Sequence, residues 1–249
     1  MKKTGFVFLA VVLAFFWTGC QSSVKAALRT QKDPIALVSV VSNQDISWKQ
    51  DPNFKHENLA NTTNSPGLFQ KKALQKDSDM TIATSADDLI NTAEDIFRKN
   101  IEASGVIDLA DKATVLNSGA YKNARINKFQ ASRDTLKPAD YLFVDYKDKN
   151  FPPALASETG IQRSMFVEFN FTKAMATGVG KNGNFRANVD MTINILDAQG
   201  KVLYRTTFSL GSKDTMKVSN GVYSQSGLLD LFDSAITDVC YEFLDDLGS

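Results

Sequence analysis

The sequence predicts an α/β (α+β) fold in which helices pack on a mixed sheet. Three features predict it: an apolar, β-branched run over residues 35–41, alternating apolar residues over 164–210, and a wide apolar stripe of helical period over 226–247. We expect the order strand, helix, strand, helix, strand, followed by three antiparallel strands and a C-terminal helix.

The composition excludes several classes of protein. The 249 residues carry 28 basic and 28 acidic side chains, and a pI near 6.6 argues against a nucleic-acid partner. The single histidine, His56, leaves no basis for a histidine triad or a multi-histidine metal site, and two cysteines cannot supply a disulfide framework or a thiolate zinc site. The length predicts one domain of ordinary size or two small ones, and the counts exclude enzymes that depend on histidine triads or on thiolate zinc. Together with the motifs considered below, we expect no metal, no cofactor and no enzymatic activity.

Residues 1–19 are predicted to be a signal peptide. Lys2 and Lys3 precede an apolar stretch of 13 residues, Gly5–Trp17, which is shorter than the roughly 20 residues of a membrane span. The small residues before Cys20 resemble the bacterial lipoprotein signal, in which this cysteine is lipidated and becomes the N-terminus. The alternative is an ordinary signal peptide with an incidental cysteine. Gln21 follows the cysteine, and by the same resemblance the destination is the outer membrane.

The mature chain is predicted to have a tether and one globular domain. Residues 20–33 are polar and predict a lipidated tether, and residues 34–249 predict a single domain. Without Lys2 and Lys3 the mature chain has 26 basic and 28 acidic residues, so the lipid has no polybasic help in anchoring it. Residues 42–83 show no sustained period and predict a long irregular loop.

The first half of the domain predicts three strands and two helices. The run 35–41 is apolar on both alternating faces, which is typical of a strand buried on both sides. A helix is predicted from the Ser85 cap to Gly105, with its apolar stripe at helical spacing. Residues 106–109 predict a short strand, 121–129 a weaker helix and 141–146 a core strand.

The second half predicts an antiparallel meander and a closing helix. The expected strands cover 164–175, 184–196 and 201–210, with a hairpin loop at Asp197–Gly200. Ser226 is predicted to cap the last helix, and Cys240 to be a buried small apolar side chain on it.

The motifs that could carry chemistry have simpler explanations. Gly178–Gly183 matches the letters of a dinucleotide fingerprint, but a strand follows where a helix is required, so a hairpin turn is the better interpretation. Asp145, Asp148 and Glu168 could form a carboxylate pair, although solvated strand ends explain them as well. Asp77–Asp79 begins like a calcium loop but lacks its glycine and distal glutamate. No catalytic residue is predicted.

The least regular segments predict the partner-binding surface. Its candidate residues are Trp48, Phe54, Lys213, Lys217 and Tyr223. The alternative for Trp48 is that its ring plugs the edge of the core.

Three features are similar to a family of envelope lipoproteins that includes the curli-secretion lipoprotein and the lipoprotein activators of penicillin-binding proteins. The segment 138–144 (PADYLFV) looks like that family's "GADYLV" strand, and 193–204 (INILDAQGKVLY) looks like its "LVDTRTGEVLW" hairpin. The closing amphipathic helix is the third feature. The resemblance implies an α/β domain akin to the N-terminal domain of TolB.

Three functions follow as hypotheses. The first is a non-enzymatic lipoprotein of the outer membrane that binds another envelope protein. The second is a subunit of an oligomeric secretion channel, in which residues 166–196 rearrange into membrane-crossing strands. The third is a carrier of a small apolar ligand beneath the long loop. The 13 residues of the tether that follow Cys20, residues 21–33, reach only about 45 Å, which is short for crossing a periplasm. The oligomeric state stays open.

Overall fold

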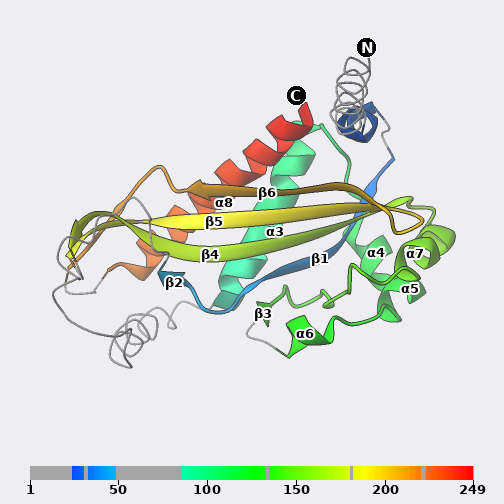
Figure 1. Cartoon of the computed structure of the whole chain (residues 1–249), viewed down its shortest axis with the longest axis horizontal. Coiled ribbons are helices and arrows are strands. Elements are labelled where there is room, and N and C mark those ends of the chain that lie inside the picture. Colours follow the sequence, from blue (N-terminus) through cyan, green and yellow to red (C-terminus); the bar gives the residue numbers. More distant parts are fainter. Residues whose placement is uncertain are drawn as a thin grey trace, which may run out of the picture.

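A computed structural model describes residues 24–30, 33–48, 86–132, 135–179, 182–219 and 223–248 (Figure 1). After a helix over residues 24–30, the elements follow in the order β1 (Ile35–Asn43), β2 (Ser47–Trp48), α3 (Ala86–Ser104), α4 (Lys112–Asn117), α5 (Gly119–Lys122), α6 (Lys128–Ala131), β3 (Thr135–Leu136), α7 (Phe151–Thr159), β4 (Arg163–Val179), β5 (Asn182–Asp197), β6 (Val202–Gly211), β7 (Met216–Val218) and α8 (Gln225–Gly248).

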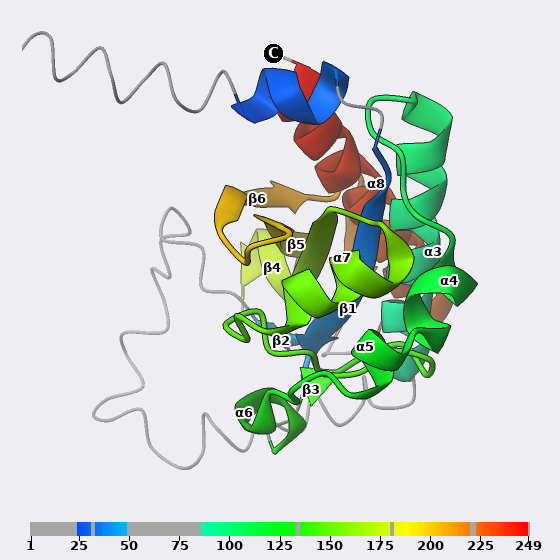
Figure 2. The same ribbon diagram turned by 90° about the vertical axis from the view of Figure 1, so that its right-hand side faces the viewer.

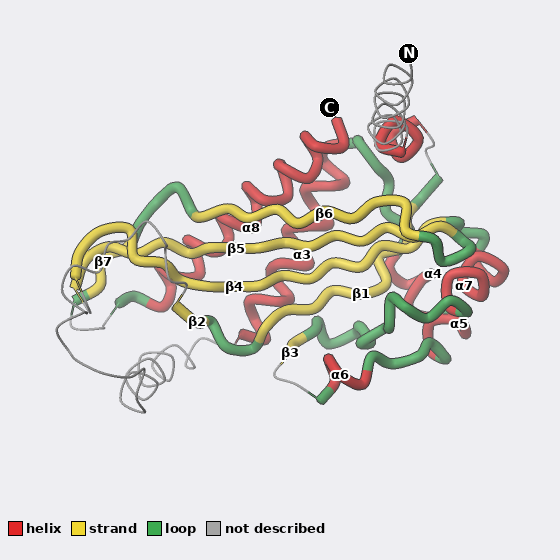
Figure 3. Tube along the Cα trace, in the orientation of Figure 1, coloured by secondary structure: helices red, strands yellow, loops and turns green. Residues whose placement is uncertain are grey.

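The strands form one mixed, seven-stranded sheet (Figure 3), which confirms the predicted fold class. The main order is β3-β1-β4-β5-β6, with β1 parallel to β4 and β4, β5 and β6 antiparallel in succession. The short strand β2 pairs with the second half of β4, at Thr172 and Lys173. The short strand β7 pairs with the first residues of β5, at Gly183–Phe185, which lie at the same end of the sheet. Within the described ranges, no helix is both long and apolar enough to cross a membrane.

Helices cover both faces of the sheet, but unequally. The long helices α3 and α8 lie on one face, and α4, α5 and α7 lie on the other face near one end (Figure 2). In β1, Leu37 and Val40 join the larger core cluster while Ala36 and Val38 join the smaller one. A register shift between Leu37 and Ser39 explains why Leu37 and Val40, three residues apart, share a face. The prediction of a strand buried on both sides is confirmed.

The antiparallel meander agrees with its predicted phase. Phe169 and Phe171 of β4 face the larger core cluster, and Phe166 faces the smaller one. Gly178 and Gly183 lie opposite each other where β4 and β5 meet, with φ of 107° and 151°, so the glycines serve a hairpin. The dinucleotide interpretation is thereby excluded at this position, because no helix follows.

The two long helices are confirmed, with one change at a cap. Gly105 has a φ of 60° and follows the last residue of α3, as predicted. The prediction that Ser226 caps the last helix is wrong. The helix begins at Gln225, and the Ser224 hydroxyl accepts a hydrogen bond from the Gly227 amide at 3.2 Å. Cys240 is fully buried, as predicted, and burial raises the pKa of its thiol to about 12.

Residues 106–146 depart from the predictions. The expected strand over 106–109 is only one isolated bridge, Leu109 to Ile35, and the expected helix over 121–129 is split into α5 and α6. The prediction of a core strand over 141–146 is wrong. Its backbone pairs locally with the segment before α6, since the Asn127 amide donates to the Phe143 carbonyl at 2.7 Å and the Asp145 amide to the Arg125 carbonyl at 2.9 Å.

Two helices on the smaller core were not predicted. The first is α4, which Asp111 caps through the Thr114 amide at 2.7 Å. The second is α7, whose first turn holds Pro152 and Pro153. Prolines are tolerated in a first turn because the amides there have no partner within the helix.

A buried polar cluster holds residues 137–144 against α3 in place of a strand ladder. The carboxylate of Glu94 accepts hydrogen bonds from Arg98, from the Tyr141 hydroxyl at 3.0 Å and from Lys112 at 3.2 Å. Arg98 also donates to the Tyr141 hydroxyl at 2.7 Å. Burial alone would raise the pKa of Glu94, but the hydrogen bond and charge of Arg98, with the charge of Lys112, lower it below 4.5.

The segment predicted as a tether is partly structured. Residues 24–30 form a helix beside the C-terminus of α8, and the Leu28 side chain is only 3% exposed. Lys25 pairs with Asp246 at 2.7 Å, so this part of the segment is attached to the domain. The structure thus differs from a free tether over these residues.

We expect Glu94→Gln to destabilise the domain by about 2–4 kcal/mol, because it leaves Arg98 and Lys112 without their shared counter-charge. Urea unfolding at pH 7 measures this loss. Asp95→Asn is the matched control: Asp95 is the neighbouring, exposed carboxylate on α3, so its loss should change the free energy of unfolding by less than about 0.5 kcal/mol. Equal effects of the two changes would contradict the role given to Glu94.

The free energy of unfolding of the wild type and that of Glu94→Gln should depend differently on pH. Because the folded-state pKa of Glu94 is lowered, its contribution to stability is fully present above its ordinary pKa of 4.5. That contribution is lost as the pH falls through the folded-state pKa. The stability gap between the wild type and Glu94→Gln should therefore be largest near neutral pH and shrink below about pH 4.

Candidate functional site

Two of the five predicted partner-binding residues meet at one end of the sheet. Trp48 lies on β2 and Tyr223 lies just before α8, and both rings approach the ammonium group of Lys173 on β4. This end, where β2, β7 and the start of α8 come together, is on the left in Figure 3. We refer to Trp48, Lys173, Phe185 and Tyr223 as the aromatic–lysine cluster.

Lys173 is the centre of this cluster and is completely buried. Its Nζ atom lies 5.1 Å from the centroid of the Trp48 ring and 5.4 Å from that of Tyr223, within the range of cation–π attraction. Nζ also donates a hydrogen bond to the Tyr223 hydroxyl at 3.2 Å. Aromatic faces and a hydroxyl thus stabilise a charge that is removed from water.

The aromatic rings of the cluster support one another through Phe185. This residue of β5 makes edge contacts with Trp48 at 5.5 Å and with Tyr223 at 5.0 Å between ring centroids. Trp48 is also the register partner of Lys173 in the parallel pairing of β2 with β4. Segments far apart in the sequence are therefore joined through one small group of side chains.

Sequence reasoning missed Lys173, although a signal was present. Along β4, the side chains at Phe169, Phe171, Lys173 and Met175 all have the core-facing phase, and a lysine in that phase needs partners. Two of its partners, Trp48 and Tyr223, come from β2 and from the residues just before α8, and no periodicity connects these segments to β4.

Lys213 and Lys217, which were also predicted as contact residues, are not part of the cluster. Lys213 has an 80% exposed side chain and forms an ion pair with Asp238 of α8 at 2.8 Å, which raises its pKa. Lys217 is exposed on β7, with Asn184 as its register partner. Phe54 and Cys20 lie outside the described residues, as do His56 and Asp77–Asp79. Trp48 is half-buried and packs on the larger core cluster, so its ring is shared between core and surface.

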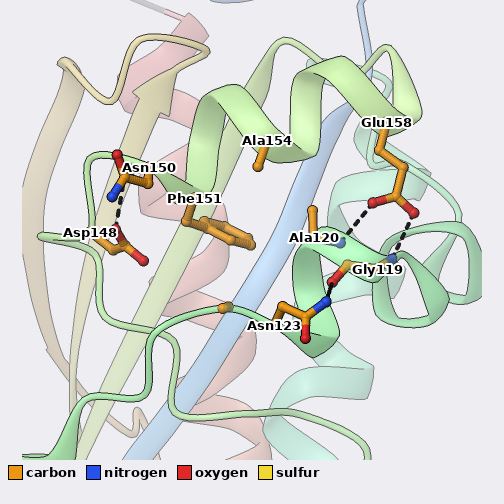
Figure 4. Close-up of a pocket in the computed structure, with 9 residues that line it drawn as sticks. Gly119, Ala120, Asn123, Asp148, Asn150, Phe151, Ala154 and Glu158 are labelled. Carbon is orange, nitrogen blue, oxygen red and sulfur yellow. Dashed lines mark hydrogen bonds between the residues drawn. The ribbon is translucent and has the colours of Figure 1, made fainter.

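A pocket lies at the opposite end of the molecule, between α5 and α7 (Figure 4). It has a volume of about 460 Å³ and is lined by Gly119, Ala120, Asn123, Ala124, Asp148, Asn150, Phe151, Ala154 and Glu158. The Glu158 carboxylate accepts hydrogen bonds from the Gly119 and Ala120 amides at 2.6 and 2.7 Å, and these bonds lower its pKa. Glu158 thus links α7 to the first turn of α5.

The pocket does not suit a purely apolar ligand. Its wall carries the amides of Asn123 and Asn150 and the carboxylates of Asp148 and Glu158 around a floor of Phe151 and Ala154 (Figure 4). Asp148 accepts a hydrogen bond from the Asn150 amide at 3.0 Å.

The carboxylates that could have formed a catalytic pair have structural partners or lie on the surface. Asp145 pairs with Arg125 at 2.8 Å, and Glu168 is exposed on β4. Among the residues that the structure describes, no group of three or more His, Cys, Asp or Glu side chains could hold a metal ion.

The chain is similar to a solved structure of a bacterial protein domain. No family model matches the chain, and neither does any curated protein. Among solved structures, the LpoB C-terminal domain from Salmonella enterica is similar over 78% of this chain and 97% of that domain, with 10% sequence identity and a TM-score of 0.26.

We expect Tyr223→Phe to lower the free energy of unfolding by about 1–2 kcal/mol, because it removes one hydrogen-bond acceptor of the buried Lys173 and keeps the ring. Urea unfolding, followed by the fluorescence of Trp48, measures the loss. Tyr241→Phe is the matched control, since this hydroxyl is on a side chain that is 51% exposed, and its removal should have no measurable effect. A silent Tyr223→Phe would show that the hydrogen bond contributes nothing.

Proposed function

We propose that this protein is a non-enzymatic lipoprotein, anchored in the outer membrane through Cys20, that binds another envelope protein. The observation that carries the binding role is the meeting of Trp48 and Tyr223, from two separate segments, at one end of the sheet. The partner contacts this end of the sheet, where the two rings are half-buried and Lys217 of β7 is exposed.

The chemistry of this surface favours a protein partner. Tryptophan and tyrosine are enriched in protein interfaces because they offer a large contact area at little cost in conformational entropy. Both rings are half-buried, so the cluster holds them in place while part of each stays accessible. Two exposed cations lie nearby, Lys213 before β7 and Lys217 on it. They favour a partner with acidic groups at the rim of the interface.

The anchor has support from cysteine chemistry. The chain has two cysteines, and Cys240 is fully buried with a raised pKa, so Cys20 is the one that can be acylated. The sequence around Cys20 resembles a lipoprotein signal, and multiple acyl chains make a stable anchor where one chain is marginal.

A second candidate is a subunit of an oligomeric secretion channel. It is favoured by the length of β4 and β5, 17 and 16 residues, which exceeds the roughly 9–11 residues of a membrane-crossing strand. Against it, the apolar faces of both strands are covered by α3 and α8, and a channel would have to expose them.

We expect Cys20→Ala to move the protein out of the membrane fraction and to abolish its labelling with radioactive palmitate. Cys240→Ala is the matched control and should leave both unchanged, because it removes a thiol that is buried between helices. Palmitate labelling that persists in Cys20→Ala, or membrane retention without label, would contradict the proposed anchor.

Binding at the aromatic–lysine cluster can be tested in living cells with a photoreactive amino acid at position 217. We expect a specific cross-linked product that Trp48→Ala reduces at least about tenfold, since a central aromatic residue of an interface is worth 2 kcal/mol or more. The same amino acid in place of the exposed Lys147, on the segment before α7, is the control and should give none of this product. Equal products at both positions would contradict the assignment of the surface.

The mass of the lipidated protein in detergent, measured by light scattering, separates the two candidates. A monomer or dimer supports the adaptor, and a ring of many copies supports the channel.

A further inference from the structure

The N-terminal helix and the C-terminal end of α8 form a clasp that joins the anchor segment to the domain. The Lys25 ammonium pairs with the Asp246 carboxylate at 2.7 Å, and Arg29 donates to the Gly248 carbonyl at 2.6 Å. The Leu28 side chain is 3% exposed and belongs to the larger core cluster. Polar and apolar contacts from a helix of only seven residues, 24–30, therefore attach it to the domain.

The clasp extends into the sheet through Asp246. Its second carboxylate oxygen accepts a hydrogen bond from the Tyr204 hydroxyl of β6 at 2.7 Å. Burial raises the pKa of Asp246, but the hydrogen bonds from Lys25 and Tyr204, with the charge of Lys25, lower it below the ordinary value. The carboxylate is thus held ionised between the helix, α8 and β6.

Helix α8 separates the clasp from the aromatic–lysine cluster. Tyr223 lies two residues before α8 and Asp246 lies in its last turn, and 24 helical residues span about 36 Å. Figures 1 and 2 both show the helix over residues 24–30 beside the C-terminal end of α8, and Figure 3 places β2 and β7 at the other end. The two functional ends of the domain are therefore opposite each other.

The position of Cys20 makes this arrangement relevant to the membrane. Cys20 precedes Val24 by four residues, which reach at most about 14 Å. A clasped domain is thus held near the bilayer by the C-terminal end of α8. Two exposed apolar side chains, Val202 at the start of β6 and Tyr241 near the end of α8, belong to this same end. The exposed ring of Tyr241 suits the headgroup region, where tyrosine is enriched.

We propose that the helix over residues 24–30 is an orientation clasp, which fixes the C-terminal end of α8 against the membrane surface and holds the aromatic–lysine cluster at the membrane-distal end. The proposal rests on the lipidated Cys20 of the proposed function and adds to it the side of the domain that faces the bilayer. Without the clasp, the domain would hang from a 13-residue tether with a reach of about 45 Å and no fixed orientation.

Energy transfer measures the orientation of the lipidated protein in vesicles of phosphatidylethanolamine and phosphatidylglycerol that carry an acceptor dye on a lipid headgroup. A donor dye is attached to a cysteine introduced at the exposed position Glu242→Cys, near the clasp, or Lys217→Cys, on β7. Labelling is specific because Cys240 is fully buried and Cys20 is acylated. We expect strong transfer from position 242 and weak transfer from position 217.

Hydrogen exchange in the same vesicles measures the clasp itself. We expect the amides of residues 24–30 to exchange slowly in the wild type and about tenfold faster or more in the double variant Leu28→Ala with Asp246→Ala. In that variant the two donor positions should also give similar transfer. Asp245→Ala, which removes the adjacent exposed carboxylate, is the matched control and should behave as the wild type.

The outcomes separate the clasp from the anchor. Fast exchange over residues 24–30 in the wild type, or equal transfer from positions 217 and 242, overturns the clasp while the protein still sediments with vesicles. Protein that does not stay with the vesicles overturns the anchor instead, and in that sample the exchange of residues 24–30 still reports whether the helix is docked.

Discussion

The pairing of β4 with two different neighbours is the constraint on which the rest of the structure depends. On one side β4 is parallel to β1, and on the other it forms a long antiparallel ladder with β5. Its side chains alternate between the two core clusters, with Phe169 and Phe171 beneath the long helices and Phe166 beneath the short ones. Because a shift of one residue in register would exchange these two sets, the packing of both helical layers depends on this strand.

The region between α3 and α7 is held in place mainly by side-chain hydrogen bonds and not by strand pairing. Here the chain adds only the two-residue strand β3 to the sheet, and the buried carboxylate of Glu94 organises the region by accepting hydrogen bonds from Arg98, Lys112 and Tyr141. A buried charge is tolerated only when it is paired and hydrogen-bonded, which is the case for Glu94. Because breaking this cluster would leave buried charges unpaired, the segment around Tyr141 stays in place without the regular hydrogen bonding of a strand.

In our proposals the two ends of α8 have different roles, one in partner binding and the other in orientation at the membrane. Its N-terminal end lies next to Tyr223 and the aromatic–lysine cluster, and its C-terminal end carries Asp246 and the clasp. The helix body is buried against the sheet through residues such as Phe232 and Phe243, so the distance between the two ends is set by a rigid element. A lipoprotein built in this way would present its binding surface at a fixed height above the bilayer.

The sequence by itself determined the fold class, both long helices and the three-stranded meander, because each of these elements buries one continuous face and therefore shows a period of 2 or 3.6 residues. The tertiary structure alone decided the rest. Residues 141–146 look like a strand by composition, yet the hydrogen bonds of Tyr141 to α3 and of Phe143 to Asn127 place them outside the sheet. Trp48 and Tyr223 could be proposed as surface residues, but Lys173, which joins them, depends on contacts between segments far apart in the chain. The helix over residues 24–30 is polar enough to resemble a tether, and only its docking partners, Asp246 and the core around Leu28, make it part of the domain. Local patterns report which face of an element is buried, whereas a site depends on which elements meet, and that is a property of the packed structure.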